Sequence, residues 1–160
     1  MPRRPDTPRR LVDRVERRIP NALLDSGPAR LGAAFATAVA LAWAAPLSTG
    51  RIERHGELIV CRGLPKWAFR RGGTCVGRVY LTAGNVNEAV LRHEAVHVAQ
   101  WRRYGMLFPI LYALAGTDPL RNRFEIEAGL EDGGYARRSA DDGASSEAGT
   151  RSAQPSSRSS

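Results

Sequence analysis

Two histidines four residues apart, His93 and His97, enclose Glu94 in the run HEAVH. On a helix, residues at this spacing lie about 40° apart on one face, so both imidazoles can bind one metal ion. The Glu94 carboxylate follows the first histidine, where it can accept a proton from a water on that metal. The pattern therefore predicts a metal site with an acid–base group beside it.

A catalytic zinc site needs a third protein ligand, and the last helix expected from the sequence offers two carboxylates, Glu125 and Glu127. These lie about 200° apart on a helix, so only one can face the metal. An apolar stripe is formed by Leu120, Phe124 and Ala128. Glu127 is near the centre of this stripe, which favours it as the residue that faces inward. Glu125 lies at the edge of the stripe, which favours it instead if the ligand must extend past the packed side chains to reach a site between helices.

The helices that must position these residues have recognisable ends. Asn87 is a natural N-cap for a helix over residues 89–104, and Gly105 ends it. Asp118 and Pro119 predict an N-cap and first helical position for a last helix that continues to about Glu131. The run MLFPILYALA over residues 106–115 predicts a short buried helix, with a membrane-dipping element as the alternative.

Short β-rich runs precede the motif helix, at residues 57–61 and 74–81. They predict a hairpin or small antiparallel sheet packed on the HExxH helix and the C-terminal glutamate helix. The fold class expected is α+β, with a metal-binding domain over residues 49–135. Residues 1–19, with seven arginines and three prolines, predict a disordered basic arm or frayed helix, and residues 136–160 predict a disordered tail.

The most apolar stretch, LGAAFATAVALAWAAPL at residues 31–47, dominates the segment 20–48. Its 17 residues lie at the lower limit for spanning a bilayer, and alanine makes it weakly hydrophobic. A helix packed on the core, a membrane anchor and a cleaved secretory signal ending near Ala42–Ala44 are the three interpretations. The protein is accordingly expected in the cytoplasm or at a membrane, with secretion as a further alternative.

The net charge of +8 invites a nucleic-acid interpretation, and all but one of the 24 basic residues are arginine. The arginines are scattered over the chain without an aromatic-interleaved platform, which argues against nucleic acid as the main partner. Cys61 and Cys75 are too few for an iron–sulfur cluster held by cysteines alone. They can pair across a hairpin or remain as two buried free thiols.

Several other residues are weaker candidates. Gln100 follows His97 by three residues and can orient a ligand or face solvent. His55 is a lone histidine expected at the surface. Three tyrosines can stabilise an oxyanion or pack in the core: Tyr104, Tyr112 and Tyr135.

The two helical blocks resemble the gluzincin type of zinc metallopeptidase, in which HExxH is completed by a glutamate on a later helix. In that type an alanine commonly follows the glutamate by three residues and an aspartate by four, which matches Glu125 and Ala128 and favours Glu125 over Glu127. Gly129 replaces the aspartate, so the partner that orients a histidine must come from elsewhere, with Asp132 as a candidate.

The blocks HEAVHVAQW and NRFEIEAGLEDGGY also resemble a group of small uncharacterised bacterial proteins, some labelled iron–sulfur oxidoreductases. The resemblances cover about residues 50–135 and imply a minimal zincin-like domain that hydrolyses peptide bonds in a peptide or protein substrate. Zinc (Zn²⁺) would activate water, Glu94 would act as base and then acid, and the strand 75–81 would pair with an extended peptide. The alternative is a zinc-binding module without hydrolytic activity, tethered to a membrane through residues 31–47.

Overall fold

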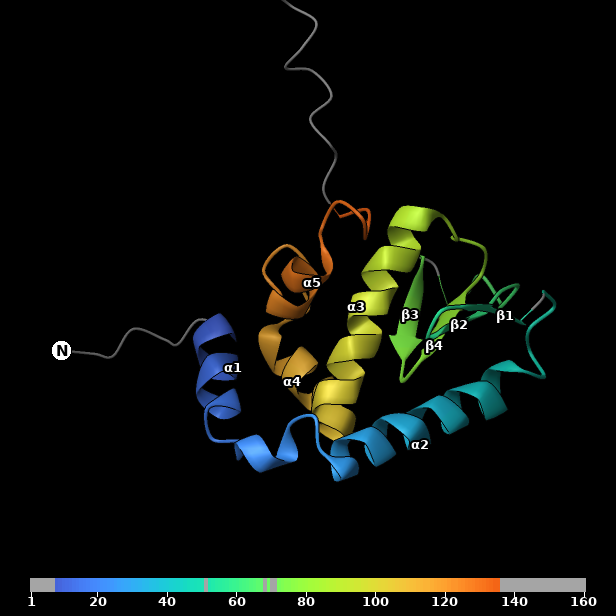
Figure 1. The fold of residues 1–160 in the computed structure, drawn as a ribbon. Coiled ribbons are helices and arrows are strands. Elements are labelled where there is room, and N and C mark those ends of the chain that lie inside the picture. The colour runs from blue at the N-terminus through green and yellow to red at the C-terminus, as the bar shows by residue number, and fades with distance from the viewer. Residues whose placement is uncertain (1–7, 51, 68, 70–71, 136–160) are drawn as a thin grey trace, which may run out of the picture.

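Helix α3 (Glu88–Tyr104) carries the paired histidines and lies between the sheet and the other C-terminal helices (Figure 1). The computed structural model describes residues 8–50, 52–67, 69 and 72–135, which form an α+β fold. The α3 helix begins where the Asn87 side chain accepts a hydrogen bond from the Val90 N–H at 2.9 Å. It ends at Gly105, whose φ of 55° breaks the helical backbone. Both ends agree with the sequence prediction.

The sheet is mixed, whereas the sequence predicted an antiparallel one. Its described strands are β1 (Ile52–His55), β2 (Leu58–Cys61), β3 (Gly73–Val76) and β4 (Val79–Thr82), in the order β1-β2-β4-β3. The hairpins β1–β2 and β3–β4 are antiparallel, but β2 and β4 pair in parallel. Two hairpins joined side by side thus form one sheet.

The run 74–81 contains two strands instead of the single strand expected. Gly77, with φ of 62°, reverses the chain between β3 and β4. As a result β3 is an edge strand, and β4 lies inside the sheet between β2 and β3. An added peptide strand could therefore pair only with the β3 part of the segment 75–81.

Helix α2 (Gly27–Ala44) packs its alanine face on the fold and runs along one border of it, across the end of α3 and past the sheet (Figure 1). The Ser26 hydroxyl caps it by accepting from the Ala29 N–H at 3.2 Å. Five alanines at helical spacing are buried: Ala29, Ala33, Ala36, Ala40 and Ala44. This matches the packed-helix interpretation of residues 31–47. Among the described residues, no helix has the length and apolar character needed to cross a membrane.

The N-terminal segment is helical where it is described. Helix α1 (Pro8–Glu16) falls within residues 1–19, for which the sequence predicted a disordered arm or frayed helix. Val12 is fully buried, and α1 packs on α4 (Phe108–Ala115), because Val12 and Val15 form an apolar stripe. The 3₁₀ helix Asn21–Leu23 then leads to α2. Residues 1–7 and the predicted tail 136–160 lie outside the described residues.

The apolar run 106–115 forms a 3₁₀ turn (Gly105–Leu107, labelled η2) followed by α4, with Pro109 at the start of the helix. Helix α5 (Arg123–Ala128) is shorter than the last helix predicted, which began near Asp118 and continued to Glu131. Its N-cap is Asn122, whose side chain accepts from the Phe124 N–H at 3.0 Å. It ends before Gly129, which has φ of 94°.

Candidate metal centre

Two histidines from α3 and one glutamate from α5 converge in the interior. His93 Nε2 and His97 Nε2 are 3.1 Å apart. Glu125 lies across from them, with Oε2 at 3.1 Å from His93 Nε2 and Oε1 at 3.5 Å from His97 Nε2. All three residues are buried, at 2%, 6% and 2% exposed, and their ligand atoms lie within 4.8 Å of one another. The structure thus brings together the predicted set His93, His97 and Glu125.

The hydrogen bonds of the two imidazoles decide which nitrogen carries the proton. His93 Nδ1 lies 3.0 Å from the Gly129 carbonyl oxygen, which can only accept. His97 Nδ1 lies 2.8 Å from Gln100 Oε1, which is also an acceptor. Both Nδ1 atoms must therefore donate, so each neutral ring turns an unprotonated Nε2 toward the other and toward Glu125.

This arrangement fits a metal ion. Two nitrogen lone pairs and a carboxylate repel one another at these distances unless protons or a cation lie between them. Glu125 Oε2 is buried and has no hydrogen-bond partner among the described residues. Two imidazoles and one carboxylate are donors that zinc accepts, with a fourth position left for water. The group could hold a metal ion.

Glu94 stands next to this group and is 7% exposed. Burial, the largest influence, raises its pKa, Glu125 raises it further and the two histidines lower it, so the pKa reaches about 7. Its Oε2 has no hydrogen-bond partner among the described residues. A carboxyl with a pKa near 7 can both accept and donate a proton at neutral pH.

Both Glu94 and the histidine–glutamate group open onto a cavity of about 250 Å³. One wall is the edge strand β3, residues 73–76, and the opposite wall comes from α4. Aromatic side chains complete the lining: Trp101, Phe108, Tyr112 and Tyr135. The site is thus a partly enclosed, mainly apolar cavity with polar groups at its base.

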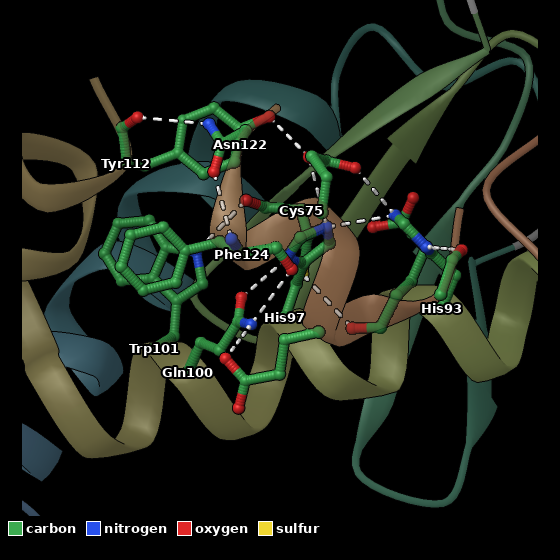
Figure 2. A network of polar contacts seen from close by, with 12 residues as sticks. Cys75, His93, His97, Gln100, Trp101, Tyr112, Asn122 and Phe124 are labelled. Atoms are coloured by element: carbon green, nitrogen blue, oxygen red, sulfur yellow. Dashed lines mark hydrogen bonds and ion pairs between the residues drawn. The ribbon is translucent and has the colours of Figure 1, made fainter. Parts of the chain in front are cut away.

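Gln100 holds His97 in position and is 3% exposed (Figure 2). Its Nε2 donates to the Phe124 carbonyl oxygen at 3.2 Å and to Glu127 Oε2 at 3.1 Å, which fixes its Oε1 toward His97. The structure therefore places Gln100 in the ligand-orienting position and not at the surface. Glu127 is exposed and contacts this amide instead of the histidines.

Gly129 occupies the sequence position where the resemblance expects an aspartate, and its carbonyl oxygen orients His93. The side-chain candidate for that role, Asp132, pairs with Arg92 at 3.1 Å instead. Sequence reasoning missed the carbonyl because every residue has one and only the backbone path places it.

Tyr112 reaches Glu125 from α4 and donates a hydrogen bond to Glu125 Oε1. Burial alone would raise the pKa of Glu125, but the close contacts with His93 and His97 and the hydrogen bond from Tyr112 lower it below its ordinary value. Burial and the Glu125 contact raise the pKa of Tyr112, so it remains a donor. Figure 2 shows Tyr112 across from the histidines of α3.

The remaining candidates divide between the cavity and other places. Tyr135 lines the cavity, its ring 6.0 Å from that of His93, whereas the Tyr104 hydroxyl bonds Glu16 of α1. His55 ends β1 with a side chain that is 40% exposed, in agreement with the surface prediction.

Cys61 and Cys75, both within the described part of the chain, are free thiols. Cys75 lines the cavity, and burial raises its pKa well above the usual thiol value, with Glu94 adding to the shift. The thiol is therefore protonated at neutral pH.

Comparison with known proteins found no match among family models, curated proteins or solved structures. The fold and the site therefore define the class of this protein on their own. It is an α+β protein with a small mixed sheet and a buried His-His-Glu group that could hold a metal ion.

Proposed function

We propose that this chain is a minimal zincin-like domain and a zinc-dependent metallopeptidase, as the resemblance of its two helical blocks to gluzincins implies. The observation that carries the proposal is the convergence of His93, His97 and Glu125 next to Glu94 in one cavity. The first three residues would hold zinc. Glu94 would act as the general base.

Zinc bound at this group would lower the pKa of a water to about 7 and polarise a substrate carbonyl. Glu94 takes the proton from the attacking water and later gives it to the leaving amine. Gln100 and the Gly129 carbonyl hold the two imidazoles so that both Nε2 atoms face Glu125, where zinc would bind.

The position of β3 supports an extended peptide as substrate. Residues 73–76 line the cavity, and β3 is at the edge of the sheet with one side unpaired by described strands. A peptide that added to this edge would bond through its backbone and pass beside the site.

A metal-binding module without hydrolytic activity is the second candidate. The cavity of about 250 Å³ favours it, because pockets for drug-sized ligands usually span about 300–1,000 Å³. In that case His93, His97 and Glu125 would hold zinc for a binding or regulatory role, and Glu94 would have no chemical task.

Metal analysis and peptidase assays on the full chain and three variants separate these possibilities. We expect one bound zinc in wild type and in Glu94→Gln, and loss of zinc in His97→Ala and Glu125→Ala. Hydrolysis of a broad peptide library should be lost in all three variants. Glu127→Ala is the matched control, since it removes a neighbouring carboxylate and should retain zinc and most of the activity.

Zinc retained in Glu125→Ala but lost in Glu127→Ala would overturn the ligand assignment. Zinc in wild type with no turnover on any peptide would favour the binding module. A wild-type protein that takes up no zinc would contradict both candidates.

A further inference from the structure

Helix α2 turns its small residues inward and its large apolar residues outward. Its alanine face is buried, whereas Leu31, Phe35, Val39 and Trp43 are 72%, 62%, 51% and 44% exposed. They follow one another at intervals of four residues, so they form one continuous stripe along the helix. Among globular proteins a surface helix normally shows the reverse pattern. The stripe therefore calls for a partner outside the described fold.

Neighbouring elements extend this stripe at both ends. At the start of α2, a Cβ added to Gly32 would lie 2.9 Å from the Met106 backbone nitrogen, so η2 sits directly against the helix. Three apolar residues there are exposed: Met106, Leu107 and Ile110. At the other end the Trp43 ring lies 6.3 Å from that of Phe69. Two positions before Phe69 is Trp67, the most exposed large apolar residue of the described chain at 78%.

We refer to these residues together as the apolar surface: Leu31, Phe35, Val39, Trp43, Trp67, Met106, Leu107 and Ile110. Figure 1 shows that α2 runs along one border of the molecule, where a planar partner can reach its whole length. Contiguous exposed apolar patches of this kind mark interaction sites.

The charges around the apolar surface identify the kind of partner. Every residue of the surface comes from a segment without aspartate or glutamate, namely 26–52, 58–87 or 95–117. The same segments contain basic residues, including Arg30 at the start of the stripe and Lys66 beside Trp67. The acidic residue that precedes α2, Asp25, pairs with Arg103 at 3.8 Å. The segments that form the surface thus carry basic and no acidic residues, a composition that is complementary to an anionic lipid interface.

We propose that the apolar surface docks this protein on the face of a bilayer that contains anionic lipids. Helix α2 would lie in the plane of the membrane, with its stripe among the acyl chains near the headgroups. The two exposed tryptophans at one end are residues that prefer this interfacial depth. The proposal is independent of the metal site, since it uses none of the residues that line the cavity.

Vesicle flotation with the full chain tests the docking. Vesicles of phosphatidylcholine mixed with an equal amount of phosphatidylglycerol should bind wild type, and phosphatidylcholine vesicles should bind it weakly. Leu31→Asp should reduce binding about tenfold or more, because a leucine that would enter the bilayer is lost and a negative charge would face the anionic lipid. Leu120→Asp is the matched control: Leu120 is a 53% exposed leucine in the segment between α4 and α5 and is not part of the apolar surface, so binding should be unchanged.

Tryptophan quenching by brominated phosphatidylglycerol gives a second measurement that avoids a new charge. Trp43 and Trp67 should be quenched, while Trp101, buried with its indole N–H bonded to the Cys75 carbonyl at 3.1 Å, should not. Quenching should therefore disappear in the double variant Trp43→Phe, Trp67→Phe, which retains the apolar character of the surface.

Equal vesicle binding by wild type and Leu31→Asp would overturn the proposal. It would show that the arginines, and not the apolar surface, bind the vesicles. Absence of binding to either vesicle type would also overturn it. A dimer in solution that Leu31→Asp dissociates, without vesicle binding, would show that a second copy of the chain covers this surface instead.

Discussion

At the scale of single residues, the orientation of His97 depends on an amide held from two sides. Gln100 is buried, accepts from His97 Nδ1 and donates to both the Phe124 carbonyl and Glu127. These two acceptors prevent the amide from flipping, because a flipped amide would place its oxygen against them. The His97 tautomer that presents Nε2 to a metal is therefore fixed by α5 as well as by α3.

Gln100→Ala is expected to weaken zinc binding about 10- to 100-fold, since the partner that fixes the His97 ring is removed while all three proposed ligands remain. Competition with a zinc-chelating dye at neutral pH measures the change in affinity. Glu127→Ala is the control, because Gln100 keeps the Phe124 carbonyl as its second acceptor, and it should lose less than Gln100→Ala. Wild-type affinity in Gln100→Ala would show that His97 needs no such partner.

The sequence predicted the proposed metal ligands, but it did not predict all the groups that hold the two histidines in position. The spacing of His93 and His97 predicted their shared face, and the resemblance selected Glu125. The helical-wheel argument favoured Glu127 because it counted Leu120 as part of the helix, whereas Leu120 lies before α5 and is 53% exposed. The supports depend on backbone carbonyls and long-range contacts, which leave no signature in residue types.

At the scale of elements, α2 packs on the β3–β4 turn at a distance that only glycine allows. A Cβ added to Gly77 would lie 2.5 Å from the Thr37 backbone nitrogen and 2.9 Å from the Ala33 carbonyl oxygen. The Thr37 hydroxyl also accepts from the Arg78 N–H at 3.0 Å, so the turn is bonded to the helix. Displacing the turn would move β3, which lines the cavity.

Gly77→Ala and Gly56→Ala form a matched pair that measures this packing. Gly77 and Gly56 are each the first residue of a two-residue hairpin turn, with φ of 62° and 61°, but an added Cβ at Gly56 meets nothing within 4 Å. Gly56→Ala should cost about 1–2 kcal/mol from backbone strain alone, and Gly77→Ala about 1–3 kcal/mol more from overpacking. Urea unfolding measures both values. Equal losses would mean that α2 does not press on the turn.

Elements formed by interactions between residues close in the sequence were predicted correctly, and those that depend on distant residues were not. Helix α3 was predicted at both ends because Asn87 and Gly105 act locally. Helix α5 was predicted to start too early because its cap, Asn122, also donates to the carbonyls of Tyr112 and Gly116, which only the fold brings near. The parallel pairing of β2 with β4 likewise depends on a connection whose path the residue pattern does not specify.

At the scale of the whole molecule, α1 closes the helical half of the fold through a charged contact with α5. Arg123 pairs with Glu16 and with Asp13, the latter at 3.0 Å, and the Tyr104 hydroxyl of α3 donates to Glu16 at 2.5 Å. Three helices distant in the chain therefore meet at one carboxylate. Val12 of α1 is fully buried and belongs to the same apolar cluster as Tyr104 and Phe124.

The stability of the protein should therefore depend on the ionisation of Glu16. Burial by itself would raise the pKa of Glu16, but hydrogen bonds from Arg123 and Tyr104 bring it below the ordinary value of 4.5. A lowered folded-state pKa stabilises the fold above the unfolded pKa, and that contribution is lost as the pH falls through the folded-state pKa.

Glu16→Gln should accordingly lower the free energy of unfolding by about 1–3 kcal/mol at neutral pH, because Arg123 loses its anionic partner in a partly buried place. The difference from wild type should shrink as the pH falls below 4.5, where Glu16 itself becomes protonated. Urea unfolding at neutral pH and at about pH 3 measures both values. Glu57→Gln is the control, since Glu57 is 63% exposed and pairs with Arg102 at 3.8 Å, so its loss should cost less than about 1 kcal/mol. A difference between wild type and Glu16→Gln that stays constant across this pH range would mean that the Glu16 charge does not hold α1 in place.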